Sequence, residues 1–177
     1  MNKTIFLVGA RASGKTTMGR LLAEKLNYSF VDTDVYLYES TQRTVAEIVE
    51  KEGWEGFRKQ ESQVLKDVTQ PCRVIATGGG MILADQNRLH MQKMGIVFFL
   101  SAPAKILAER LMKDPNMAQR PSLTGLSIVD EMEKILEERH HLYMDSASHV
   151  INVDCQEMQI LGPVSYTHLT LPTNREV

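Results

Sequence analysis

The chain has 177 residues, a formal net charge of −2 and 43% apolar residues. This length fits one domain with a sizeable core, and the small charge gives no general attraction to nucleic acid or to an anionic membrane. No apolar run approaches the roughly 20 residues of a membrane span, and the N-terminal residues lack a signal-peptide pattern. Cys72 and Cys155 lie far apart and have no metal-ligand spacing, so we expect reduced thiols in a cytoplasmic protein. We also expect a monomer.

Apolar runs alternate with helical patterns along the chain, which predicts strands separated by helices. In chain order, the first half contains a strand over Thr4–Val8, a helix over Lys15–Leu26, a strand over Tyr28–Val31, a helix over Val45–Val68 that breaks near Gly53 and Gly56, and a strand over Arg73–Ala76. The second half contains a helix over Asp85–Met94, a strand over Ile96–Leu100, helices over Pro103–Met112 and Ser127–Asp145, and a strand over His149–Val153.

The predicted strands are apolar enough to be covered on both faces of a sheet. Strands that alternate with helices typically form a parallel sheet with helices on both sides. We therefore predict an α/β fold in which a five-stranded parallel sheet is flanked by helices. The segment Lys113–Gly125 contains two prolines and is long for a connection in a compact domain, which indicates a functional loop.

The segment after Leu161 does not fit this fold. It carries two prolines and no apolar stripe, whereas a three-layer domain is expected to close with a helix on its last strand. The run PVSYTHLTLPTNREV resembles a translation of adaptor DNA used to prepare sequencing libraries. We expect residues 1–161 to form a single domain and residues 162–177 to be a non-native tail; the alternative is a natural irregular tail.

The segment Gly9–Thr16 reads GARASGKT and matches the phosphate-binding pattern G-x-x-x-x-G-K-[ST] between a predicted strand and a predicted helix. Glycines let successive backbone N–H groups point at phosphate oxygens, and the helix N-terminus adds a positive dipole end. Lys15 would place a cation on the β- and γ-phosphates, and the Thr16 hydroxyl would ligate Mg²⁺. The motif predicts a nucleoside triphosphate site but does not name the acceptor.

Two carboxylates follow the second predicted strand. Asp32 ends that strand, and Asp34 points to the same side if the strand continues. Open α/β sheets bind ligands at the carboxyl ends of their strands, so one carboxylate would assist the metal and the other the acceptor hydroxyl. The alternative is that one of them only caps a helix that starts near Val35.

Glycines and arginines provide further candidates for ligand binding. Gly78–Gly80 follow the third strand and allow close ligand approach, although a plain turn has the same sequence. Arg139 lies on an inward helix stripe, where it either binds an anion or extends past the core to solvent. Arg58 has Glu61 one turn further on as an ion-pair partner, or is an ordinary surface charge. The other members of the Arg139 stripe are Met132, Ile135, Leu136 and Tyr143.

Two more arginines lie near the predicted ATP site. Arg120 belongs to the long loop, which we interpret as a lid over about residues 112–126. Such a lid excludes water and brings a cation to the transferring phosphoryl group. Arg110 on the preceding helix is a candidate for stacking on adenine, and a surface arginine is the alternative.

The chain resembles the shikimate kinase family, in the order and spacing of its motifs, from about Asn2 to Val153. The pattern is most similar to the enterobacterial type of the enzyme. The segments that carry the resemblance are GARASGKTT, FVDTD, EGWEGFRKQE, ATGGG, QRPSLTG and ERHHLY. One departure is Ala12-Ser13, where relatives often have glycine and cysteine.

The resemblance implies a small P-loop kinase with the nucleoside-monophosphate-kinase-like fold. Such an enzyme transfers the γ-phosphate of ATP to the 3-hydroxyl of shikimate, which gives 3-phosphoshikimate and ADP on the way to chorismate and the aromatic amino acids. Its expected small-molecule partners are therefore shikimate and ATP, and its expected cofactor is Mg²⁺.

The resemblance also implies roles for individual residues. Lys15, Asp34 and Arg120 would be catalytic, with Asp34 positioning the acceptor hydroxyl. Thr16 and Asp32 would hold Mg²⁺, Asp32 through water. The residues implied for shikimate are Asp34, Arg58, Gly79, Gly80 and Arg139, with the arginines facing its carboxylate. The residues implied for ATP are Ala12, Ser13, Gly14, Lys15, Thr16, Thr17 and Arg120, to which Arg110 is added as the adenine candidate.

Two alternative functions stay open on the sequence alone. One is another small P-loop kinase, such as a gluconate or nucleotide kinase, and the other is a nucleotide-binding regulator without transferase activity. Two arginines beside an acidic pair favour a polyhydroxy carboxylate over a nucleobase as the acceptor. A pure binder needs neither the acidic pair nor a lid arginine, which argues against a regulator.

Overall fold

The fold is organised around a five-stranded sheet. The computed structural model describes residues 3–114 and 126–154, so Arg120, most of the predicted lid and the predicted tail lie outside the described residues. The strands run in the order β2-β3-β1-β4-β5, and every neighbouring pair is parallel, which confirms the predicted sheet. The strands are β1 (Thr4–Val8), β2 (Ser29–Asp32), β3 (Arg73–Ala76), β4 (Gly95–Ser101) and β5 (His149–Asn152).

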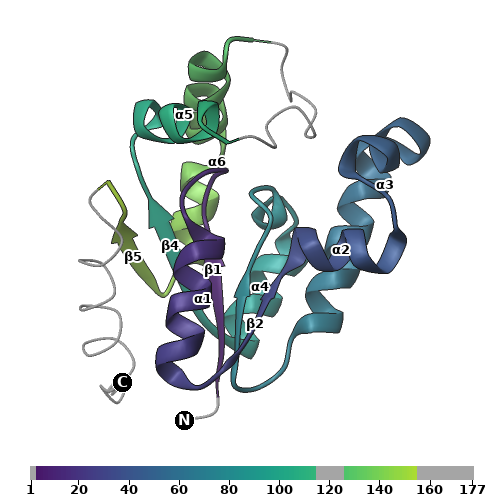
Figure 1. The fold of residues 1–177 in the computed structure, drawn as a ribbon, viewed down its shortest axis with the longest axis vertical. Coiled ribbons are helices and arrows are strands. Elements are labelled where there is room, and N and C mark those ends of the chain that lie inside the picture. The colour runs from purple at the N-terminus through teal and green to yellow at the C-terminus, as the bar shows by residue number, and fades with distance from the viewer. Residues whose placement is uncertain (1–2, 115–125, 155–177) are drawn as a thin grey trace.

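Helices follow the strands and lie to either side of the sheet, with α2 and α3 together on one flank in Figure 1. None of the helices in the described part of the chain combines the length and the apolarity of a membrane span. The helices are α1 (Lys15–Leu26), α2 (Thr33–Thr41), α3 (Val45–Val68), the 3₁₀ turn η1 (Met81–Leu83), α4 (Asp85–Met94), α5 (Ala104–Met112) and α6 (Ile128–Ser146).

Each face of the sheet has its own buried core, because alternate residues of a strand point to opposite faces. Ile5 and Leu7 of β1 pack with side chains of α1 and α5, whereas Phe6 and Val8 pack with side chains of α3 and α4. Helix α6 contributes to both cores. Every residue of β1 is buried, which explains why this strand is apolar almost throughout.

The second strand ends where the sequence left two alternatives. It does not continue past Asp32, because the Asp32 side chain caps α2 by accepting hydrogen bonds from the backbone N–H groups of Asp34 (3.0 Å) and Val35 (3.3 Å). The cap is therefore Asp32, and Asp34 lies in the first helical turn. Helix α2 is the helix that the sequence offered only as the alternative to a continuing strand, and η1 was not predicted.

The break in α3 is simpler than predicted. Gly53 has φ 72° and ψ 174°, which interrupts the helix there, while Gly56 keeps helical dihedral angles. The predicted break near Gly53 and Gly56 is confirmed and lies at Gly53, where one glycine with positive φ is enough to change the helix direction. The new direction carries Phe57 and Glu61 into the buried side of the molecule.

The carboxyl ends of β1, β2 and β3 lie side by side, because the three strands are parallel neighbours. The Gly9 loop, Asp32 and the glycine loop Gly78–Gly80 therefore meet at one edge of the sheet. This edge is where open α/β sheets bind ligands, and it contains both of the cavities described next.

Candidate active site

The loop between β1 and α1 has the backbone of an anion-binding turn. Gly9, Ala12 and Gly14 have positive φ angles of 151°, 62° and 88°, a pattern that lets consecutive N–H groups converge on an anion. The Lys15 ammonium group lies across this loop, where Nζ donates to the carbonyl oxygens of Gly9 (2.9 Å) and Ala10 (2.7 Å). The lysine thus holds the loop closed at the N-terminus of α1.

This loop borders an open cavity, which we call the phosphate cavity. Of the predicted ATP contacts from Ala12 to Thr17, all but Ser13 line it; Ser13 is buried, with its hydroxyl next to Gly9. Arg110 lines neither cavity, and its guanidinium donates to the carbonyl oxygen of Val153 (2.6 Å). The cavity is lined by Arg11, Ala12, Gly14, Lys15, Thr16, Thr17, Asp32, Asp34, Thr77, Gly79 and Asp114.

Thr16 and Asp32 meet at the edge of the phosphate cavity, where the Thr16 hydroxyl donates to Oδ2 of Asp32 at 2.5 Å. Mg²⁺ prefers oxygen ligands and commonly takes one or two from the protein and the rest from phosphate and water. The Thr16 hydroxyl and the Asp32 carboxylate lie side by side and match this coordination preference. The described residues hold no cluster of three or more His, Cys, Asp or Glu side chains that would bind a metal without a phosphate ligand.

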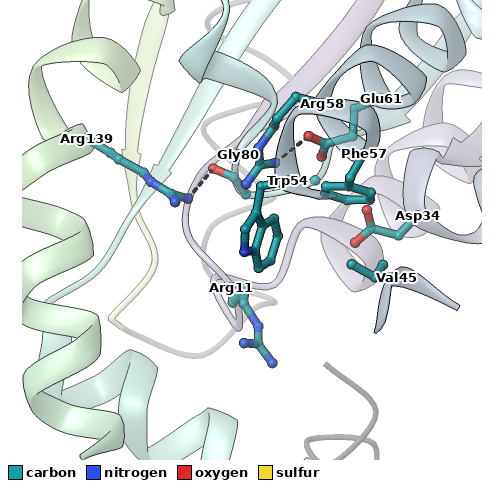
Figure 2. Close-up of a pocket in the computed structure, with 11 residues that line it drawn as sticks. Arg11, Asp34, Val45, Trp54, Phe57, Arg58, Glu61, Gly80 and Arg139 are labelled. Atoms are coloured by element: carbon teal, nitrogen blue, oxygen red, sulfur yellow. Dashed lines mark hydrogen bonds and ion pairs between the residues drawn. The ribbon is translucent and has the colours of Figure 1, made fainter. Parts of the chain in front are cut away.

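A second cavity adjoins the first, and we call it the arginine cavity. Figure 2 shows its charged side chains reaching in from different elements, with Arg139 on α6 and Arg58 on α3. All five residues predicted to bind the acceptor line it: Asp34, Arg58, Gly79, Gly80 and Arg139. The other lining residues are Arg11, Val45, Trp54, Phe57, Glu61 and Gly78.

Arg58 is fixed in place by the side chains around it. Its Nη1 donates to Glu61 one turn further along α3, and its guanidinium lies 5.5 Å from the Trp54 ring centroid and 5.1 Å from that of Phe57. Glu61 is only 4% exposed. Burial raises the pKa of Glu61 to about 7, with a further increase from Asp34, although Arg58 and Arg139 act in the opposite direction.

Gly78 separates two carboxylates that converge on the glycine loop. A Cβ atom at this position would lie 2.7 Å from Oε1 of Glu61 and 2.8 Å from Oδ1 of Asp34, so any larger residue would push the two carboxylates out of place. The Gly78 N–H donates to the Thr33 hydroxyl (3.0 Å), which ties the loop to the first turn of α2. Asp34 and the glycine loop are therefore held as one unit.

Helix α6 holds the other side of the glycine loop. The Tyr143 hydroxyl donates to the carbonyl oxygen of Gly79 at 2.6 Å, and Arg139 Nη1 approaches the same oxygen at 3.4 Å. Burial raises the pKa of Tyr143 to about 12, so its hydroxyl stays protonated as a donor. Among the described residues, Nε of Arg139 is buried and has no hydrogen-bond partner. A buried arginine donor on a cavity wall suits an anionic ligand.

The sequence alone did not assign four of the residues that build this site. Glu61 was considered only as a partner for Arg58, and Tyr143 only as a member of an apolar stripe. Arg11 occupies an unspecified position of the phosphate-loop motif, and Trp54 lies in a segment without a chemical signature. A usable signal existed only for Tyr143, four residues after Arg139 and thus on the same helix face.

A phosphate loop at the end of β1, next to a cavity lined by carboxylates and arginines, is the arrangement of a P-loop kinase. The sequence pattern of the family described as shikimate kinase matches residues 11–164. Curated relatives and solved structures with high coverage agree with that match, as described next. This chain belongs to the shikimate kinase family, whose members are ATP-dependent phosphotransferases.

Among the curated relatives, Shikimate kinase 2 of Syntrophotalea carbinolica is 52% identical over 161 residues, covering 91% of this chain and 94% of the relative. Shikimate kinase 2 of Photorhabdus laumondii is 54% identical over 152 residues, covering 86% and 87%. The solved shikimate kinase of Acinetobacter baumannii, in complex with shikimate, superimposes with a TM-score of 0.86 at 34% identity and covers 96% of each chain. A gluconokinase of Sinorhizobium meliloti has a TM-score of 0.58 at 17% identity, which shows a shared fold alone.

Proposed function

We propose that this chain binds ATP in the phosphate cavity and shikimate in the arginine cavity, and transfers the γ-phosphoryl group to the 3-hydroxyl of shikimate. The observation that carries the proposal is that the two cavities share a wall. Asp34 lines both of them, so one carboxylate reaches the donor side and the acceptor side of the site. The solved relative in complex with shikimate supports the choice of acceptor.

The arginine cavity suits a small polyhydroxy carboxylate. Arg58 and Arg139 both line it, and a guanidinium donates two parallel hydrogen bonds to a carboxylate. Asp34 at the opposite end accepts hydrogen bonds from ring hydroxyls. Trp54 and Phe57 provide an apolar surface against which the carbon ring packs. Shikimate then lies with its carboxylate toward the arginines and one hydroxyl toward the phosphate cavity.

The phosphate cavity suits the triphosphate of ATP. The α1 N-terminus and the positive-φ turn provide backbone N–H groups, and Lys15 provides a cation beside them. Thr16 and Asp32 are the residues that would hold Mg²⁺, Asp32 through water because both its oxygens already accept hydrogen bonds. When bound, Mg²⁺ neutralises charge on the phosphate oxygens. The lid role of Arg120, a monomeric state and a cytoplasmic location stay predictions from the sequence.

The proposed reaction is an in-line displacement at the γ-phosphorus. The 3-hydroxyl oxygen forms a bond to that phosphorus, the bond to the bridging oxygen breaks, and ADP leaves with the electron pair. The hydroxyl proton passes to the Asp34 carboxylate. Catalysis comes mainly from holding the two reactants together and from neutralising charge on the transferring group.

Asp34→Asn is the variant that tests this assignment. It keeps the size of the side chain but removes the proton acceptor, so we expect kcat to fall about 10²–10⁴-fold while ATP binding is retained. Asp67→Asn on the exposed face of α3 is the matched control, because Asp67 lines neither cavity. Steady-state kinetics and ATP titration calorimetry measure the two effects. Loss of ATP binding in Asp34→Asn, or an unchanged kcat, would contradict the role given to Asp34.

A further inference from the structure

Three residues line both cavities: Arg11, Asp34 and Gly79. A phosphoryl group that is transferred from a donor in one cavity to an acceptor in the other must pass these three residues, because they lie at the boundary between the cavities. Lys15 lines only the phosphate cavity, and Arg58 and Arg139 line only the arginine cavity. Within the described lining of the two cavities, Arg11 is thus the cationic side chain at the crossing.

The backbone holds Arg11 firmly at this position. Arg11 lies three residues after the buried end of β1, inside the loop whose carbonyl oxygens Lys15 binds. A Cβ atom at Gly79 would lie 3.5 Å from the Arg11 backbone nitrogen, so the phosphate loop and the glycine loop pack directly against each other. In Figure 2, the Arg11 side chain extends on the far side of the Trp54 indole from the Arg58–Glu61 pair, so the two arginines serve different parts of the site.

We propose that Arg11 is a further catalytic residue, whose guanidinium contacts the transferring phosphoryl group between ATP and the acceptor. This inference rests on the proposed function. During transfer the negative charge is spread over the oxygens of the phosphoryl group and the leaving oxygen. A planar guanidinium donates two parallel hydrogen bonds to adjacent oxygens of such a group, whereas the N–H donors of an ammonium diverge from one nitrogen. Lys15 neutralises negative charge on the ATP phosphates, and Arg11 neutralises charge on the phosphoryl group while it lies between the two cavities.

The test compares Arg11→Met, Arg11→Lys and the matched control Arg20→Met. Arg20 is an exposed arginine on α1 that lines neither cavity, so its loss changes the net charge equally. We expect Arg11→Met to lower kcat about 10²–10³-fold, with each KM within a few-fold of the parent value. We expect Arg11→Lys to have a higher kcat than Arg11→Met but a lower one than the parent, because lysine restores the positive charge without the planar pair of guanidinium donors. Arg20→Met keeps the parent kcat.

A binding experiment separates this role from a structural one. ADP, aluminium fluoride and shikimate together mimic the transferring group, and such analogues bind through transition-state contacts. We expect Arg11→Met to weaken this ternary complex at least tenfold, while ADP alone and shikimate alone bind as in the parent. A parent-like kcat in Arg11→Met, or an increase in KM with kcat unchanged, overturns the inference and leaves the proposed function intact. A parent chain that does not phosphorylate shikimate overturns both.

Discussion

Glu61 has its carboxyl group at a buried position, where the charged form is energetically unfavourable. It is 4% exposed, it faces Asp34 across Gly78, and its main compensation is the ion pair with Arg58. Burial is the largest cause of its raised pKa of about 7. The folded chain therefore binds this proton more tightly than the unfolded chain, in which glutamate has its ordinary value of 4.5.

The pH dependence of stability follows from that difference. The stabilisation is complete below the ordinary pKa of 4.5 and is lost as the pH rises through about 7. A shift of this size corresponds to a loss on the order of 3 kcal/mol. Glu61→Gln cannot ionise, so we expect the parent chain to lose stability relative to this variant between pH 5 and pH 8. Urea denaturation at intervals of one pH unit measures it, and parallel profiles for the two proteins would contradict the account.

Helix α6 is the element that connects the acceptor site to the core. Arg139 and Tyr143 lie one turn apart on it, and both approach the carbonyl oxygen of Gly79. The Tyr143 ring is fully buried and stacks on Phe99 of β4, with centroids 4.9 Å apart. The position of the glycine loop is therefore set by a rigid aromatic contact in the core.

Removing only the Tyr143 hydroxyl tests this connection. Tyr143→Phe keeps the stacked ring but leaves the Gly79 carbonyl with the longer 3.4 Å contact to Arg139. We expect unfolding free energy to fall by about 1–3 kcal/mol, and shikimate affinity to weaken with it. The control is Tyr38→Phe, because Tyr38 is 51% exposed. Chemical denaturation measures the unfolding free energy, and titration measures the shikimate affinity. If Tyr143→Phe and Tyr38→Phe have the same values for both, the Tyr143 hydroxyl does not hold the glycine loop in place.

Elements with a strong period were predictable from the sequence, and elements set by a single side chain were not. The strands and the long helices repeat apolar residues at a fixed spacing, so their bounds agree with the structure to within one or two residues. Helix α2 depends on the Asp32 cap and has little apolar period of its own, so the sequence indicated it only as an alternative, through the capping aspartate. The 3₁₀ turn η1 is three residues long, too short for any period.

The site divides in the same way. The phosphate loop is a contiguous motif with one physical purpose, so its residues were predictable from their order. Glu61 also contacts Asp34, and Tyr143 contacts Gly79; these partners lie far away in the sequence, and no spacing rule relates them to Glu61 and Tyr143. Arg11 becomes distinctive only when the fold brings two cavities to either side of it.

At the scale of the whole molecule, the parallel sheet is the feature that brings the phosphate cavity and the arginine cavity together. Three neighbouring strands end at the same edge, which places the phosphate loop, Asp32 and the glycine loop side by side. Helices α3 and α6 then supply Arg58 and Arg139 to the arginine cavity (Figure 2). Donor and acceptor cavities with a common wall are what a phosphotransferase requires and what a nucleotide-binding regulator does not.

The most direct test of the account is a phosphotransfer assay of the full chain with MgATP and, separately, shikimate, gluconate and nucleoside monophosphates. ADP release is followed by a coupled assay, and the phosphorylated product is identified by ³¹P NMR and mass spectrometry. The account predicts rapid ADP release with shikimate, a product phosphorylated at the 3-hydroxyl, and little turnover with the other acceptors. Phosphorylation of gluconate or of a nucleotide, with none of shikimate, would contradict it.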